Sequence, residues 1–176
     1  MRRLRRRTRT TNYPQPDGDL YQACRRTLTD AGLWRCSSVD EICEKVSAHI
    51  GRQIVMSPMR LGHRHMHGLL VRTDTVDYIV YESETSQFHR DHIALHELSH
   101  QLCGHRGQIG RDESTNALGR SAAIDSHSSD ADEEEAELMA SLLGMFISEP
   151  ARPTRADAAP DHKLLQVMRS FGLLEG

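Results

Sequence analysis

The five residues from His96 to His100 have the types and the spacing of a catalytic metal site. Residues four apart lie on the same face of a helix, about one turn from each other, so His96 and His100 can direct two imidazole rings at one metal ion. Glu97 lies beside His96 and can act as general base towards a water molecule on that ion. The H-E-x-x-H spacing is therefore typical of a catalytic metal site. A chain of this composition would contain the pattern by chance only about 0.05 times.

The neighbours of the motif favour a buried helix over a surface helix that carries His and Glu by chance. Ala94, Leu95, Leu98 and Leu102 form an apolar stripe along the expected helix. Buried His and Glu side chains cost free energy unless they are paired or bound to a metal. A bound metal ion would account for their presence here.

A third ligand is required, because catalytic zinc usually has three protein ligands and keeps one position for water. The acidic segment 130–137 is the best source in the sequence, and it opens an expected helix whose Ala136 and Ala140 would allow close approach to the motif helix. Most acids of this segment have an ordinary role at a helix N-terminus, where the helix dipole favours negative charge. We expect Glu134 and Glu135 to remain solvated, and the residue pattern alone leaves open which acid binds the metal.

The two segments together resemble the ImmA/IrrE metallopeptidases of the glutamate-zincin group, over about residues 38–148. The resemblance implies that the metal is Zn²⁺ and that Glu133 is its third ligand. It also implies that Glu137, where the family usually has Asp or Asn, orients a ligand histidine or serves as an alternative ligand. The likeness is carried by His96-Glu97-Leu98-Ser99-His100 and by Glu133-x-Glu135-Ala136-Glu137-x-x-Ala140-x-x-Leu143.

The resemblance also implies a substrate, because relatives in this family cleave helix-turn-helix repressors. We therefore expect a zinc-dependent endopeptidase that hydrolyses a peptide bond in a protein of that kind. The rival interpretation is a regulatory binding module that keeps the metal site and docks to a repressor without cleaving it. Glu97 favours the peptidase, since a purely structural metal site needs no general base.

Apolar periodicity and capping residues predict an α+β fold in which a small mixed or antiparallel sheet packs against helices. It would be zincin-like, with the H-E-x-x-H helix followed by a helix that bears the third ligand. The segment Val76–Glu82 is either the edge strand that binds substrate or a core strand, and residues 104–129 are expected to form a long loop. We expect helices over 20–31, 39–50, 87–103, 132–147 and 161–171, a strand over 53–57 that ends before Pro58, and a hairpin over 68–72 and 76–82.

Composition divides the chain into a flexible basic tail (1–17), a metallopeptidase domain (18–149) and a C-terminal tail with a short helix (150–176). Six arginines lie in the first nine residues, so the remainder has 16 basic against 25 acidic residues and a net charge of −9. That charge argues against nucleic-acid binding by anything but the arginine-rich tail. No apolar run reaches the roughly 18 residues of a membrane span, and four cysteines are too few for a disulfide scaffold. We therefore expect a cytoplasmic protein without membrane attachment.

Other histidines and tyrosines leave alternatives open. His105, Tyr78 and Tyr81 are candidates to stabilise an oxyanion, although the position of His105 next to Gly104 favours an exposed loop residue. His92 either faces solvent or supports a metal ligand. A second metal could be held by three histidines that alternate along a strand and would share one side of it, unless they are ordinary surface residues: His63, His65 and His67.

Overall fold

The computed structural model describes residues 18–61, 68–105, 123–125, 129–147 and 161–170, which form five helices and a four-stranded mixed sheet. The expected α+β class with a small mixed sheet is thus confirmed. The elements in chain order are α1 (Gly18–Asp30), α2 (Val39–Ile50), β1 (Gln53–Met59), β2 (Gly68–Arg72), β3 (Val76–Glu82), α3 (Gln87–Cys103), β4 (Ala123–Asp125), α4 (Asp130–Phe146) and α5 (His162–Ser170).

The strand order in the sheet is β1-β3-β2-β4. β1 runs parallel to β3, whereas β2 and β3 form the expected antiparallel hairpin with Gly68 opposite Tyr81. β4 is antiparallel to β2 and pairs with its last three residues, from Leu70 to Arg72. Because β3 has a neighbour on each side, the prediction of Val76–Glu82 as an edge strand is wrong and the core-strand alternative is correct.

Two local features of the sheet differ from the sequence-based expectation. β1 continues through Pro58 to Met59 instead of ending at Ser57. Proline lacks the N–H that a central strand requires, but among the described strands β1 pairs only with β3 and tolerates it. The second difference is β4, which lies inside the segment expected to be a loop and has only three residues, too few to show a strand pattern.

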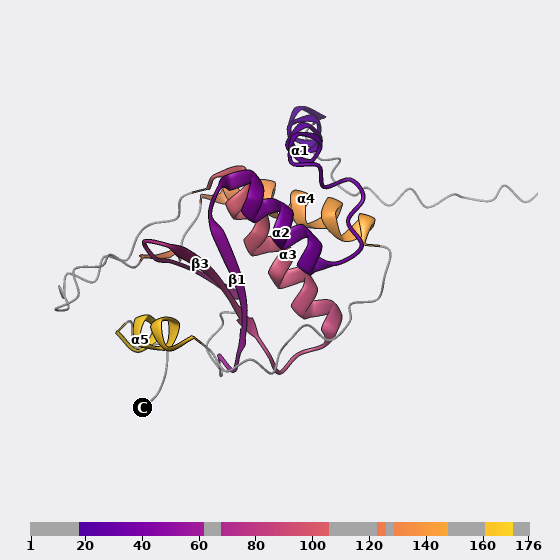
Figure 1. Ribbon diagram of the computed structural model, residues 1–176. Helices are drawn as coiled ribbons and strands as arrows, with labels where there is room; N and C mark the ends of the chain where they lie inside the picture. Colours follow the sequence, from indigo (N-terminus) through magenta and orange to yellow (C-terminus); the bar gives the residue numbers. More distant parts are fainter. Residues whose placement is uncertain (1–17, 62–67, 106–122, 126–128, 148–160, 171–176) are drawn as a thin grey trace, which may run out of the picture.

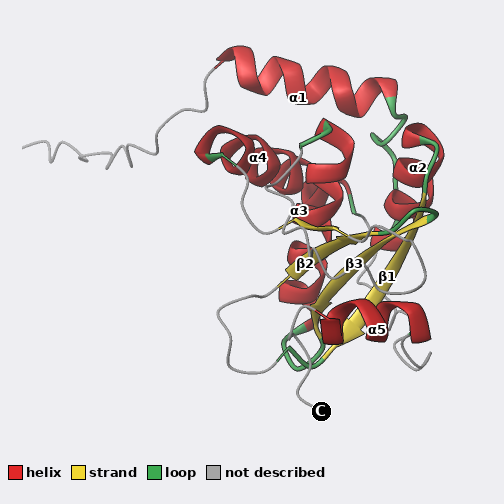
Figure 2. Cartoon of the chain, turned by 90° about the vertical axis from the view of Figure 1, so that its left-hand side faces the viewer, coloured by secondary structure: helices red, strands yellow, loops and turns green. Residues whose placement is uncertain are grey.

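Helices cover both faces of the sheet, with α2, α3 and α4 on one side and α5 on the other (Figures 1 and 2). Side chains alternate between the faces along each strand, as a pleated strand requires. Leu70 and Ile79 pack in the core with α2, α3 and α4. Val71 and Tyr78 pack on the opposite face with residues of α5. The sheet therefore separates the side that carries the H-E-x-x-H helix from the side that carries α5.

Capping residues mark both ends of α3 and the start of α4. Ser86 caps α3 by accepting a hydrogen bond from the His89 backbone N–H at 3.3 Å, and Gly104 ends the helix in the left-handed conformation with φ 72°. α4 begins with a reciprocal capping box between Ser129 and Asp132. The predicted bounds of α3 are therefore confirmed, and α4 starts two residues earlier than expected.

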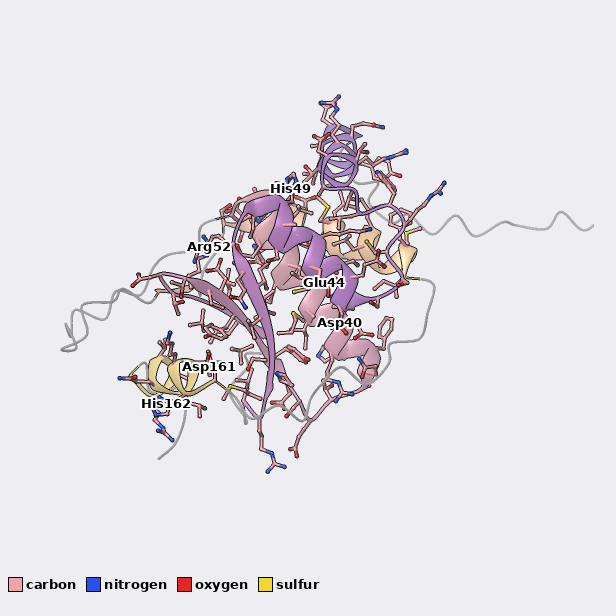
Figure 3. All side chains as sticks on the ribbon, in the orientation of Figure 1. Asp40, Glu44, His49, Arg52, Asp161 and His162 are labelled. Carbon is pink, nitrogen blue, oxygen red and sulfur yellow. The ribbon has the colours of Figure 1, made fainter. Side chains whose placement is uncertain are left out.

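The short C-terminal helix expected from the sequence is α5, and it closes the second face of the sheet. Leu164 and Met168 are completely buried there. Tyr78 of β3 donates a hydrogen bond from its hydroxyl to Asp161, 2.8 Å away. Asp161 lies just before α5 begins (Figure 3). Burial and this hydrogen bond raise the pKa of Tyr78 to about 12. Tyr78 thus lies on the α5 side, opposite α3, which contradicts its candidacy as an oxyanion ligand.

Several expectations concern residues outside the described part of the chain, namely the basic tail over 1–17 and the histidines at 63, 65 and 67. Within the described part, the helices lack the combination of length and apolarity needed to cross a membrane. All four cysteines are free thiols, three of them buried and Cys103 half-buried.

Candidate metal centre

Two histidines of α3 and one glutamate of α4 bring their ligand atoms to one point. The Nε2 atoms of His96 and His100 are 3.0 Å apart. One carboxylate oxygen of Glu133 lies 3.2 Å from His96 Nε2, and the other lies 3.5 Å from His100 Nε2. Because Glu133 is far from the histidines in the sequence, the packing of α4 on α3 creates this group, which can hold a metal ion.

Two small side chains of α4 are buried, at positions where the sequence predicted a close approach to α3. Ala136 and Ala140 are 0% and 1% exposed, and they lie one helical turn apart on the same face of α4. On α3, Leu98 is fully buried, and Ser99 donates a hydrogen bond to the Leu95 carbonyl at 2.7 Å. The two helices therefore approach closely enough for a glutamate of one to meet the imidazoles of the other.

The environment keeps His100 neutral. Its side chain is 11% exposed. Burial, followed by the proximity of His96 and His105, lowers the pKa of His100 to about 4. A neutral imidazole retains a lone pair on one ring nitrogen, which is the form that binds a metal. The Glu133 side chain is 50% exposed, so the group opens to solvent on the α4 side.

Glu137 lies behind His96 and not among the converging atoms. Its carboxylate is 3.5 Å from His96 Nδ1 and 3.4 Å from His92 Nε2. A carboxylate accepts hydrogen bonds, so this position favours a proton on His96 Nδ1 and leaves the lone pair of Nε2 for a metal. Glu137 thus lies beside both His96 and His92, and its orienting role stays a prediction.

His105 is buried, which contradicts its interpretation as an exposed loop residue. It is 7% exposed, and its Nδ1 lies 3.0 Å from Nδ1 of His100. Its other ring nitrogen, Nε2, lies 3.2 Å from the carboxylate of Glu135. His105 thus contacts His100 on the side away from Glu133, which does not fit a role in binding an oxyanion. Glu135 is half-buried by this contact, so the expectation that it remains solvated is wrong, whereas Glu134 is exposed as expected.

Glu97 is half-buried and lies against the first residue of β2. A Cβ atom at Gly68 would stand 2.7 Å from the Glu97 carboxylate and 2.5 Å from a methyl group of Ile93. Gly68 therefore provides the space that the Glu97 side chain occupies. Sequence reasoning missed this role, although a glycine at a strand position often marks a close approach.

A second group of potential ligand atoms lies beside the first. It consists of Cys103, His105 and Glu135, whose donor atoms are all within 4.8 Å of one another. Burial and the nearby Glu135 carboxylate raise the pKa of the Cys103 thiol to about 12. The sequence gives no recognised ligand spacing for this group, and it was not predicted.

Comparisons with known proteins do not identify the chain. No family model, no curated protein and no solved structure matches it. The functional interpretation therefore rests on the chemistry and geometry of these side chains.

Proposed function

We propose that the protein is a zinc-dependent endopeptidase with a zincin-like site. His96, His100 and Glu133 would hold Zn²⁺, and Glu97 would act as the general base. The observation that carries the proposal is the convergence of three lone-pair donors, two imidazole nitrogens and a carboxylate oxygen, from two helices. Imidazole with carboxylate is a donor set that zinc takes in catalytic sites, where three protein ligands leave one position open.

The spacing of the donor atoms supports this assignment. Ligand atoms about 2.0–2.1 Å from a tetrahedral zinc ion stand about 3.3 Å from one another. The three closest separations between the side chains are 3.0, 3.2 and 3.5 Å. These separations involve both oxygens of Glu133, and they are close to the spacing that ligand atoms around one zinc ion require.

The chain's own residues supply the rest of the chemistry. A zinc ion at this point would lower the pKa of a bound water and polarise the carbonyl of a peptide. Glu97 would accept a proton from the attacking water and return it to the leaving amine. Gly68 would keep the space in which the Glu97 carboxylate lies. Glu137 would hold the His96 ring with its Nε2 directed at the metal.

The proposed substrate is a helix-turn-helix repressor. This part of the proposal depends on the sequence resemblance to the ImmA/IrrE metallopeptidases and on their known substrates. Cleavage would relieve repression by the regulator, and the gene for such a regulator is expected next to the gene for this protein.

The test uses Glu97→Gln, which keeps the volume of the side chain but cannot accept the proton. General-base catalysis contributes a factor of about 10² to 10⁴, so the variant should bind zinc and fold as the wild type does, yet cleave the repressor at least about a hundredfold more slowly. Cleavage is followed on a gel after incubation of the zinc-loaded protein with the purified neighbouring regulator. In cells, the target genes should stay repressed under inducing conditions.

Glu44→Gln provides the matched control, because Glu44 is an exposed glutamate on α2, outside the proposed site (Figure 3). It should cleave at the wild-type rate. If Glu97→Gln derepresses the target genes as well as the wild type does, with the repressor intact on the gel, the peptidase proposal is wrong. The protein would then act as the docking module.

A further inference from the structure

His105 is the first residue after Gly104, the C-cap of α3, and the backbone turns back towards the helix at this point. Gly104 adopts φ 72°, which turns the backbone, and the His105 N–H then donates to the His100 carbonyl at 3.0 Å. Arg72 at the end of β2 donates from its guanidinium to the His105 carbonyl, also at 3.0 Å. The backbone of His105 is thus fixed from two sides, by the motif helix and by the sheet.

The side chain of His105 is the middle member of a line of three side chains, Glu135, His105 and His100. The Glu135 carboxylate contacts His105 Nε2 at 3.2 Å, and His105 Nδ1 contacts His100 Nδ1 at 3.0 Å. The Nε2 atom of His100, on the other side of that ring, faces the proposed metal position with His96 and Glu133. His105 is 7% exposed, so water has little access to compete for these contacts.

Proton positions along this line follow from the chemistry of each group. A neutral imidazole has one N–H and one lone pair. If His100 binds a metal through Nε2, its proton is on Nδ1 and must be donated to His105 Nδ1. His105 then has its own proton on Nε2, and the Glu135 carboxylate accepts it. Every donor in the line has an acceptor, and both rings remain neutral.

We infer that His105, backed by Glu135, is a positioning residue that accepts the Nδ1 proton of His100 and holds its Nε2 lone pair on the metal. The inference rests on the metal-binding part of the proposed function and does not depend on which peptide is cleaved. Partners of this kind fix the tautomer and the orientation of a ligand histidine, and their loss typically lowers metal affinity about 10- to 100-fold.

The proton between His100 Nδ1 and His105 Nδ1 also decides whether His105 can be a ligand in the group with Cys103 and Glu135 while His100 binds the first metal. A metal on His105 Nε2 would require the His105 proton on Nδ1, where it would be donated to His100 Nδ1. His100 would then carry its own proton on Nε2 and could not bind the first metal. Only one proton fits between two nitrogens 3.0 Å apart, so the two sites compete.

A matched pair of substitutions at His105 tests the inference through zinc affinity, measured by competition with a chelator. Asn has an oxygen near the position of His Nδ1 and can still accept the proton. Leu has nearly the same shape as Asn but has no acceptor atom. His105→Leu should weaken zinc binding about 10- to 100-fold, while His105→Asn should stay within a few fold of the wild type. A packing role would be met as well by Leu as by Asn, and equal affinities in the two variants would overturn the inference.

The zinc-loaded wild type gives a second readout that needs no variant. Long-range ¹H–¹⁵N spectra of the imidazole rings should show His100 protonated at Nδ1 and His105 protonated at Nε2. The reverse pattern would overturn the inference. So would two zinc ions per chain with one lost in Cys103→Ser, because His105 would then be a ligand. A wild type that binds no zinc would overturn both this inference and the proposed function, whereas equal affinities of Asn and Leu variants would leave the peptidase proposal in place.

Discussion

Two buried polar clusters share α3, and they differ in how their hydrogen bonds are completed. Around Asp77 of β3, which is fully buried, the carboxylate accepts from Arg52 Nε at 3.0 Å and from Gln101 Nε2 at 3.2 Å. A second guanidinium nitrogen of Arg52 binds the other Asp77 oxygen and also the Thr73 carbonyl. One residue before Gln101, His100 belongs to the second cluster, the candidate metal centre.

The cluster around Asp77 is complete by itself. Its acceptors face N–H donors, its negative charge faces a guanidinium, and it ties the turn after α2 to β3 and α3. At the metal centre, by contrast, the Nε2 atoms of His96 and His100 are 3.0 Å apart, and each lies within 3.5 Å of a different carboxylate oxygen of Glu133. Imidazole nitrogens and carboxylate oxygens are ligands for a metal ion, and a cation or a shared proton would stabilise their close approach. We therefore expect the first cluster to serve stability and the second to bind an ion.

The largest expected effect is on zinc binding and comes from the exposed member of the metal centre. Glu133→Gln removes the negative charge and leaves an amide oxygen, which is a weaker ligand for zinc. Zinc affinity should therefore fall by at least about a hundredfold, more than the loss expected for a residue that only supports a ligand, such as His105. Chelator competition measures it. Glu134→Gln is the control, because Glu134 is its exposed neighbour and should leave affinity unchanged. A wild-type affinity in Glu133→Gln would transfer the ligand role to another acid of α4.

The next largest effect should be on the free energy of unfolding and should come from the cluster around Asp77. Asp77→Asn keeps the shape but leaves the Arg52 guanidinium without its countercharge. Removing one partner of a buried ion pair typically costs about 3–5 kcal/mol. Because the Arg52 side chain is 39% exposed and can be rehydrated, we expect a smaller loss, about 2–3 kcal/mol, in the free energy of unfolding.

Urea denaturation of the zinc-free protein measures that loss, and repeating it with zinc completes the comparison. Zinc at a hundred times its dissociation constant should stabilise both the wild type and Asp77→Asn by about 2.7 kcal/mol, because the ion binds the folded state only. If zinc no longer stabilised Asp77→Asn, the two clusters would be one coupled unit and the distinction between them would be wrong.

The sequence predicted the parts of the site that depend on local geometry. His96 and His100 share a helical face because their spacing matches the period of the helix, and the bounds of α3 follow from Ser86 and Gly104. Glu133 was assigned only through a family resemblance, since nothing local relates a residue of α4 to a ring on α3. The structure brings these three together, and their role as ligands stays a prediction.

Other parts of the site depend on tertiary placement and could not be predicted. From the sequence, His105 was interpreted as an exposed loop residue. Its burial could not be predicted, because it depends on the turn at Gly104 and on contacts with Arg72 and Glu135, which are distant in the sequence. The central position of β3 likewise follows from strand order, which the hydrophobic pattern of a single strand does not specify. Gly68 could be recognised only once Glu97 was seen beside it.

The smallest expected effect concerns His96→Ala in the absence of metal, and it separates the two clusters most directly. The substitution removes a ring that contacts His100, Glu133 and Glu137, and both glutamates are about half exposed, so water can replace its contacts with them. With chelator present, the free energy of unfolding should stay within about 1 kcal/mol of the wild type, the range of an ordinary substitution at a partly exposed position. With zinc present, His96→Ala should lack the stabilisation that the wild type gains, because the ligand is missing. Urea denaturation in the two conditions measures both quantities. A loss of 2–3 kcal/mol in the zinc-free variant, like that expected for Asp77→Asn, would mean that the histidines stabilise the fold without an ion.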